Sequence, residues 1–186
     1  MGRTRGTWVV PEVLDHAKQR LAFLERQHGL KRREQSESVT TTLGYLGREL
    51  GFEVEINGRE AGAFLLVVRL SDGRLPAGGY YLHEGRRIRK HLAEVTAASF
   101  PGATKRLREA YGLRHPDRTH LLKLQVDVYA DVLQLVAADV LRRGHEVFEA
   151  PAAPTTAATV TVASRSRSGQ DLPTACRRPA APTASS

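Results

Sequence analysis

The residues best suited to chemistry in this 186-residue chain lie in the stretch HEGRRIRKHL, residues 83–92. Two histidines and a glutamate could bind a metal ion, whereas four cationic side chains could bind an anion. The spacing disfavours the metal, because on one helix His83 and His91 would lie about 12 Å apart. The zinc-protease pattern HExxH is not formed either, since the second histidine follows the glutamate too late. The stretch therefore favours an anion-binding surface.

The cations of this stretch are predicted to face solvent on a helix. Ile88, Leu92 and Val95 share one helical face and would form its buried side, with the cations opposite or on the flanks. Basic residues continue on the next predicted helix, so the pair could form a helix-turn-helix. The alternative is a plain solvated helix face. The predicted nucleic-acid-binding residues are Arg86, Arg87, Arg89, Lys90, Thr104, Lys105, Arg108, Arg114 and Arg118.

The charge distribution supports an anionic partner. The net charge is +8, and residues 83–115 carry eight Lys or Arg against three Glu. Residues 1–34 are also basic, with eight cations against four acidic residues, whereas residues 35–60 have two against five. Such segregation is expected where one surface meets an anion. We expect a nucleic acid as the partner, DNA before RNA.

A second cluster, His115, Asp117 and His120, lies at the start of a predicted long helix. Two imidazoles and a carboxylate could ligate a metal ion. However, a carboxylate in the first turn is also favoured by the positive end of the helix dipole. We interpret Asp117 as a helix cap and expect no metal or other cofactor.

Further along that helix, His120, Asp127, Asp131 and Gln134 form one polar strip. Carboxylates four residues apart could hold Mg²⁺ for hydrolysis of a phosphate substrate. Such an enzyme needs further carboxylates on a facing helix, and the other predicted helices offer no matching pair. A metal-dependent hydrolase using His120, Asp127 and Asp131 is therefore our third-ranked function. No motif for a catalytic nucleophile or a phosphate-binding loop is found, so we expect no enzymatic activity.

The elements that must position these residues begin with two predicted helices. Pro11 can begin the first, and Gly29 can end it. Ser36 or Ser38 can cap the second, which Gly51 would close. Their apolar stripes are Leu14, Ala17, Leu21 and Leu24, and then Val39, Leu43, Leu46 and Leu50.

A small antiparallel β-meander is predicted next. Apolar and acidic residues alternate over 52–56, and Asn57-Gly58 is a strong hairpin turn signal. Residues 63–70 are apolar on both faces, which indicates a central strand. A turn at 71–74 and a third strand at 80–82 complete the meander.

Three helices are predicted to follow. One contains residues 88–95 and ends before Pro101, one contains Leu107 and Tyr111, and a long one runs from Pro116 to Gly144. The order predicts an α+β fold: a helical domain with a small antiparallel β-meander inserted between an N-terminal helix pair and three C-terminal helices.

We predict one globular domain over residues 1–150. Residues 151–186 are rich in Ala, Pro, Thr, Ser and Arg and are predicted to form a disordered tail. Cys176 is the single cysteine, so no internal disulfide is expected. Because the chain has no long apolar run and no apolar signal region, we expect a cytoplasmic protein without membrane contact. The second-ranked function is a helical protein-interaction module without catalysis, which could form a homodimer through the first or the long fifth helix.

Overall fold

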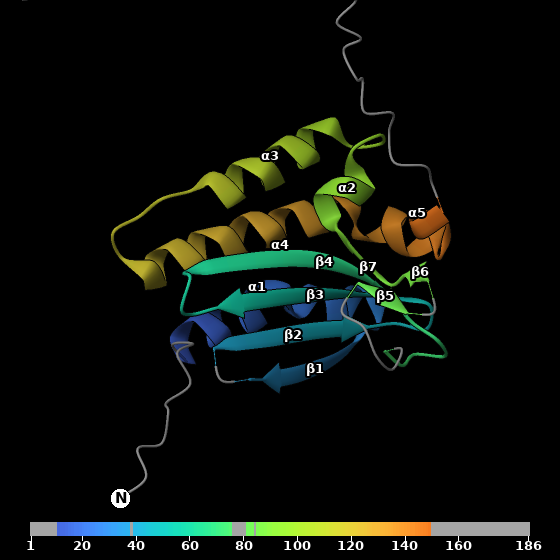
Figure 1. The fold of residues 1–186 in the computed structure, drawn as a ribbon, viewed down its shortest axis with the longest axis horizontal. Helices are drawn as coiled ribbons and strands as arrows, with labels where there is room; N and C mark the ends of the chain where they lie inside the picture. The colour runs from blue at the N-terminus through green and yellow to red at the C-terminus, as the bar shows by residue number, and fades with distance from the viewer. Residues whose placement is uncertain (1–10, 38, 76–80, 84, 150–186) are drawn as a thin grey trace, which may run out of the picture. The chain divides into compact units, whose positions relative to one another are not determined.

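The computed structural model describes residues 11–37, 39–75, 81–83 and 85–149. The predicted tail at 151–186 lies outside these residues, as do the alternative cap Ser38 and the start of the predicted third strand, Tyr80. The described part combines helices with a five-stranded antiparallel sheet (Figure 1). Its mixed α and β character agrees with the predicted fold class, but the arrangement of the elements differs from the prediction.

The main sheet has the strand order β1-β2-β3-β4-β7, and every neighbouring pair is antiparallel. Two further short strands, β5 and β6, form a separate two-stranded sheet. The strand bounds are Lys31–Ser36 for β1, Thr40–Leu46 for β2, Leu50–Asn57 for β3, Gly62–Arg69 for β4, Leu82–His83 for β5, Arg86–Arg87 for β6 and Arg89–His91 for β7.

The first helix, α1 (Pro11–His28), is confirmed with its predicted bounds. Leu21 and Leu24 are fully buried, and Gly29 ends the helix at φ +65°, a conformation that glycine adopts without strain. The predicted second helix is wrong, because its residues belong to β1, β2, the turn that follows and the start of β3.

The sequence of β2 explains this difference. Its buried side chains, Thr41, Leu43 and Tyr45, recur with a period of two, and β-branched threonines at 40–42 favour a strand. Gly47 lies in the tight turn before β3, where an added Cβ would lie 2.8 Å from the carbonyl oxygen of Leu50. Pairing with β3 thus prevails over the helical spacing of the leucines.

The β3–β4 hairpin is confirmed. The Asn57 side chain accepts hydrogen bonds from the backbone N–H groups of Arg59 and Glu60, which fixes the predicted turn. Leu65 and Leu66 are both buried, as expected for a strand covered on two faces. The 71–74 turn is also present.

The predicted helix at 88–95 is largely wrong. The helix α2 (Leu92–Thr96) begins only after β6 and β7, so Arg86 to His91 are extended. The strand β7 pairs with β4, in register Val67 with Lys90. Because neighbouring side chains of a strand point to opposite faces, the predicted helical arrangement of the cations does not form.

The last three helices are α3 (Pro101–Gly112), α4 (Arg118–Arg143) and α5 (Glu146–Glu149). The first two agree with predicted helices, although Pro101 begins α3 rather than merely separating it from the preceding helix. The helix α4 contacts α1, α3 and the strands β3 and β4 (Figure 1). One face of α4 is buried in the core against the inward side chains of β3 and β4, which include Val54 and Leu65. This α4 stripe, whose apolar spacing predicts the helix, consists of Leu122, Val126, Tyr129, Leu133, Val136 and Val140.

Candidate nucleic-acid interface

The structure does not bring the nine predicted residues onto one outward surface. The Nε atom of Arg89 lies 2.7 Å from Oε2 of Glu53, and both side chains are largely buried. Thr104 is buried and its hydroxyl oxygen lies 2.8 Å from that of Thr96. The predicted outward orientation is therefore wrong for Arg89 and Thr104.

Lys90 is also turned inward. Its ammonium group donates hydrogen bonds to the carbonyl oxygens of Val147 at 2.9 Å and Phe148 at 3.2 Å. Desolvation by burial lowers the pKa of Lys90, and the nearby Arg87 acts in the same direction. Lys90 thus anchors α5 to the edge of the sheet, and its predicted outward orientation is wrong.

The other six predicted residues are exposed but lie on separate elements. Lys105 and Arg108 line a shallow cleft of about 400 Å³ on α3, which also contains Glu109. Arg87 pairs with Glu94 at 3.0 Å, and Arg114 donates to backbone carbonyl groups beside it. Arg86 lies on β6, and Arg118 begins α4.

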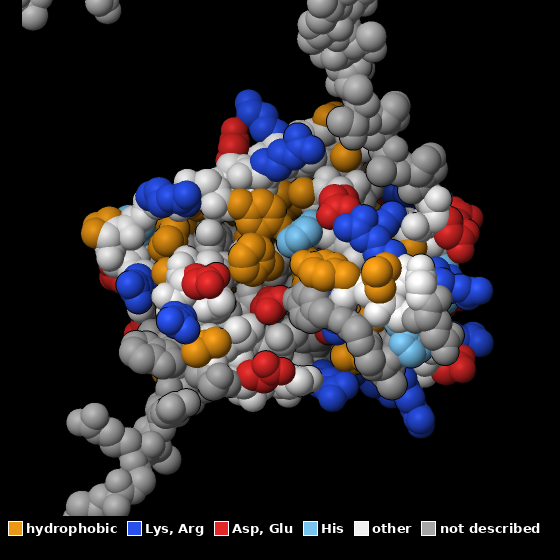
Figure 2. Space-filling model, viewed as in Figure 1, with side chains coloured by type: hydrophobic (Ala, Val, Ile, Leu, Met, Phe, Trp, Pro, Cys, Tyr) orange, Lys and Arg blue, Asp and Glu red, His pale blue; other side chains and the backbone are white. Residues whose placement is uncertain are grey.

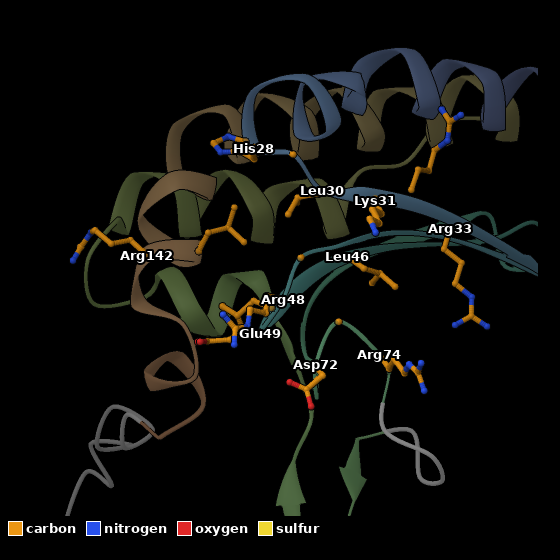
Figure 3. Close-up of a pocket in the computed structure, with 16 residues that line it drawn as sticks. His28, Leu30, Lys31, Arg33, Leu46, Arg48, Glu49, Asp72, Arg74 and Arg142 are labelled. Carbon is orange, nitrogen blue, oxygen red and sulfur yellow. The ribbon is translucent and has the colours of Figure 1, made fainter.

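A larger basic cleft, of about 920 Å³, lies at the end of the sheet where β2 meets β3 (Figure 3). It is bounded by the end of α1, the start of β1, the β2–β3 turn, the turn after β4 and the end of α4. Its charged lining residues are the cations Lys31, Arg32, Arg33, Arg48, Arg74 and Arg142 and the carboxylates Glu49 and Asp72.

Four of these cations, Lys31, Arg33, Arg48 and Arg74, are exposed and form no ion pair with any described residue. We call them the cleft cations. The other two are paired, Arg32 with Glu25 and Arg142 with Asp139. Figure 3 shows the cleft cations coming from β1, from the β2–β3 turn and from the turn after β4.

Backbone hydrogen bonds join the β2–β3 turn, which contains Arg48, to the turn after β4, which contains Arg74. The N–H group of Gly73 donates to the carbonyl oxygen of Arg48 at 2.8 Å, and that of Leu70 donates to Glu49 at 2.8 Å. Gly73 has a φ of +75°, and an added Cβ would lie 3.3 Å from the Gly47 carbonyl oxygen. The backbone positions of Arg48 and Arg74 are therefore fixed relative to each other.

Sequence reasoning missed this cleft because its cations are dispersed. Arg48 lies in the acidic stretch 35–60, and the sequence around Arg74 predicts only a turn. The available signal was the Lys31-Arg32-Arg33 run within the basic first 34 residues. Nothing local in the sequence indicates that this run meets the two turns.

The candidate metal residues have structural partners. Asp117 caps α4 by accepting from the N–H groups of Thr119 at 2.8 Å and His120 at 3.2 Å, which confirms its interpretation as a cap. The Nδ1 atom of His115 accepts from the N–H group of Asp117. Among the described residues, no three His, Cys, Asp or Glu side chains are grouped so that they could share a metal ion.

The Asp127 and Asp131 carboxylates bind cations from neighbouring helices. Arg20 of α1 donates to both, at 2.7 Å each, and Arg106 of α3 donates to Asp131 at 3.0 Å. His16 contacts Asp127 at 2.9 Å. The facing helix therefore supplies positive groups where a Mg²⁺ site would need further carboxylates.

Comparison of the chain with protein families, with curated proteins and with solved structures finds no match. Within the described residues, none of the helices combines the length and apolar character that a bilayer crossing requires. The inference of a function therefore rests on the basic cleft and on its four cations that form no ion pair with described residues.

Proposed function

We propose that this protein binds nucleic acid by its phosphates, through the cleft cations Lys31, Arg33, Arg48 and Arg74. The observation that carries this proposal is their convergence on one cleft without ion pairs to other described residues. Guanidinium groups suit phosphate, because their planar N–H groups can donate two parallel hydrogen bonds. The net charge of +8 would add long-range attraction for a polyanion.

The character of the cleft favours a polymer over a small phosphorylated molecule. Small-molecule sites are mostly apolar and enclose the greater part of their ligand. In this cleft the lining is rich in charged residues, and the cleft cations are exposed, so each phosphate contact would be weak. A nucleic acid presents several phosphates at once, and the free energies of the separate contacts then combine.

The alternative of a protein-interaction module is less favoured. Its predicted contact helices bury their apolar residues within this chain, since Leu21 and Leu24 of α1 and Leu133 of α4 are fully buried. They already serve the core, so they are not available to a partner unless the fold opens.

Fluorescence anisotropy with labelled 20-nucleotide single-stranded DNA, duplex DNA and RNA tests the proposal. If each cleft cation neutralises one phosphate, log affinity for duplex DNA should fall against log salt with a slope of about −3 to −4. Inorganic phosphate, as a small-anion control, should compete only weakly. Complete displacement by low-millimolar phosphate, or no binding to any of the three nucleic acids, would overturn the proposal.

A further inference from the structure

The basic cleft contains two carboxylates besides the cleft cations, those of Asp72 and Glu49. Both side chains are exposed, and neither forms an ion pair with a described residue. Figure 2 shows basic side chains with carboxylates among them at the end of the sheet where β2 meets β3. Charges of both signs therefore stay unpaired in one cleft, so a ligand that fits it must satisfy both.

Asp72 lies at the tip of the tight turn after β4. Ser71 and Arg74 exchange two backbone hydrogen bonds across this turn, each of 3.0 Å. Asp72 has a φ of +50° and Gly73 a φ of +75°, as in the two-residue turns that close β-hairpins. Aspartate tolerates this left-handed conformation. The closed turn thus fixes the backbone of Asp72 relative to that of Arg74.

Two cleft cations flank Asp72. Arg74 is two residues further along the chain, so their Cα atoms are about 7.6 Å apart at most. On the other side, the carbonyl oxygen of Arg48 accepts a hydrogen bond of 2.8 Å from the N–H group of Gly73, the residue next to Asp72. Figure 3 shows the Asp72 side chain between those of Arg48 and Arg74. The order across the cleft is therefore cation, carboxylate, cation.

The sugar-phosphate backbone of a nucleic acid has a matching alternation. The cations attract phosphates, whereas the carboxylate repels them and can only accept hydrogen bonds. The ligand group at Asp72 must therefore be uncharged and carry a donor. A sugar separates successive phosphates, and ribose carries a 2′-OH donor that deoxyribose lacks. A deoxyribose at this position would leave the Asp72 carboxylate without a hydrogen-bond partner.

We propose that Asp72 accepts a hydrogen bond from a ribose 2′-OH while Arg48 and Arg74 contact the phosphates on either side, so that the protein prefers RNA to DNA. This inference rests on the proposed function and names its substrate class. The helix-turn-helix expected from the sequence, a DNA-binding arrangement, does not form, because β6 and β7 lie where its first helix was predicted. One hydrogen bond of this kind changes affinity by about 2- to 12-fold.

The test compares binding of the full chain to a 12-nucleotide oligouridine and to the oligodeoxyuridine of equal length. The two carry the same base and the same phosphates, so the ratio of their affinities isolates the 2′-OH. Wild type should bind the oligouridine about 2- to 12-fold more tightly. An oligouridine with 2′-fluorine in place of the hydroxyl has no donor and should bind like the oligodeoxyuridine. Asp72→Gly tolerates the φ of +50° and should lower the ratio to about 1.

Asp72→Asn keeps a neutral acceptor oxygen, so its ratio should lie between those of wild type and Asp72→Gly. Glu49→Ala is the matched control, because it removes a carboxylate whose Oε2 atom packs over Gly144 of α4 in the same cleft. It should raise both affinities alike and keep the wild-type ratio. Thermal midpoints equal to wild type would show that the variants fold.

Two kinds of failure are distinguishable in this experiment. Equal wild-type affinity for the two oligonucleotides would overturn the ribose inference alone, as would a wild-type ratio in both Asp72 variants. An equal fall in the ratio for Glu49→Ala and Asp72→Gly would do the same, since the effect would then follow charge. No salt-dependent binding to either oligonucleotide would instead overturn the proposed function.

Discussion

Arg89 and Glu53 form an ion pair that is almost closed to solvent, with 13% and 5% of their side chains exposed. The guanidinium group contacts both carboxylate oxygens, at 2.7 and 3.3 Å. Glu53 is cross-strand from Leu66, and Leu66 from His91, so the pair lies on the sheet face opposite that of Val54 and Leu65. Arg89, one of the predicted nucleic-acid-binding cations, therefore contacts Glu53 inside the fold and does not face solvent.

Glu53→Ala should destabilise the protein by about 3–5 kcal/mol, because the largely buried guanidinium group of Arg89 would lose its two contacts with the Glu53 carboxylate. Urea unfolding followed by circular dichroism measures this loss. Glu53→Gln keeps the side-chain shape and one acceptor oxygen, so it should cost less than Glu53→Ala. A loss below about 1 kcal/mol for Glu53→Ala would show that the pair is open to water.

Lys90→Ala and Arg86→Ala should separate two roles within one short stretch. Without Lys90, the carbonyl groups of Val147 and Phe148 lose a donor, and the free energy of unfolding should fall by about 1–3 kcal/mol. Arg86→Ala should leave stability within about 0.5 kcal/mol of wild type, as is usual for an exposed position. Urea unfolding of both variants measures the two free energies of unfolding. Equal losses of stability would contradict a structural role for Lys90 and an exposed position for Arg86.

Leu133→Ala should cost about 2–5 kcal/mol, because Leu133 is fully buried in the middle of the α4 stripe. Chemical denaturation monitored by far-ultraviolet circular dichroism would detect it. Leu135→Ala, two residues along the same helix but 64% exposed, is the control and should change stability little. Similar losses at the two positions would mean that the wrong face of α4 is assigned to the core.

Stability should fall as the pH rises from 10 to 12. Burial raises the pKa of Tyr45 and of Tyr111 from 10.0 to about 12, so each ionises more easily in the unfolded chain. The stability that the two neutral tyrosines contribute is complete below pH 10. It is lost as the pH rises from 10 through their folded-state pKa values. For the fully buried Tyr45 this difference between the folded and unfolded pKa corresponds to roughly 3 kcal/mol of stability.

Unfolding free energies at pH 9, 10 and 11 measure this dependence. Tyr45→Phe has no group to ionise, so its stability should decline less steeply over the same range. A decline as steep as that of wild type would show that Tyr45 does not contribute to the alkaline loss.

Long local patterns identified much of the fold. The α1 and α4 stripes extend over several turns, and the alternation of β3 ends at an Asn57-Gly58 turn, so each element carries its own signal. The strand β7 has only three residues and gains its conformation by pairing with β4. Such long-range pairing leaves no pattern in the local sequence. The spacing of apolar residues around Ile88 indicates a helix, and nothing nearby in the sequence contradicts it.

The candidate site was harder to predict than the fold. Charge counting found the basic stretch after His83, but it could not distinguish the exposed Arg86 from the buried Lys90. Lys31, Arg48 and Arg74 come together only because β1 starts where the β2–β3 turn and the 71–74 turn meet. That convergence depends on the sheet order, which the sequence pattern left open.

The salt dependence of single-stranded DNA binding tests the central claim most directly. The variant Arg33→Ala/Arg48→Ala/Arg74→Ala should fold like wild type, because these three side chains are exposed. Its slope of log affinity against log salt should be shallower by about 2, for three lost phosphate contacts at about 0.7 each. Arg59→Ala, in the β3–β4 turn at the other end of the sheet, should keep the wild-type slope. An unaltered slope in the triple variant, or wild type that does not bind near physiological salt, would contradict the assignment of this cleft to nucleic acid.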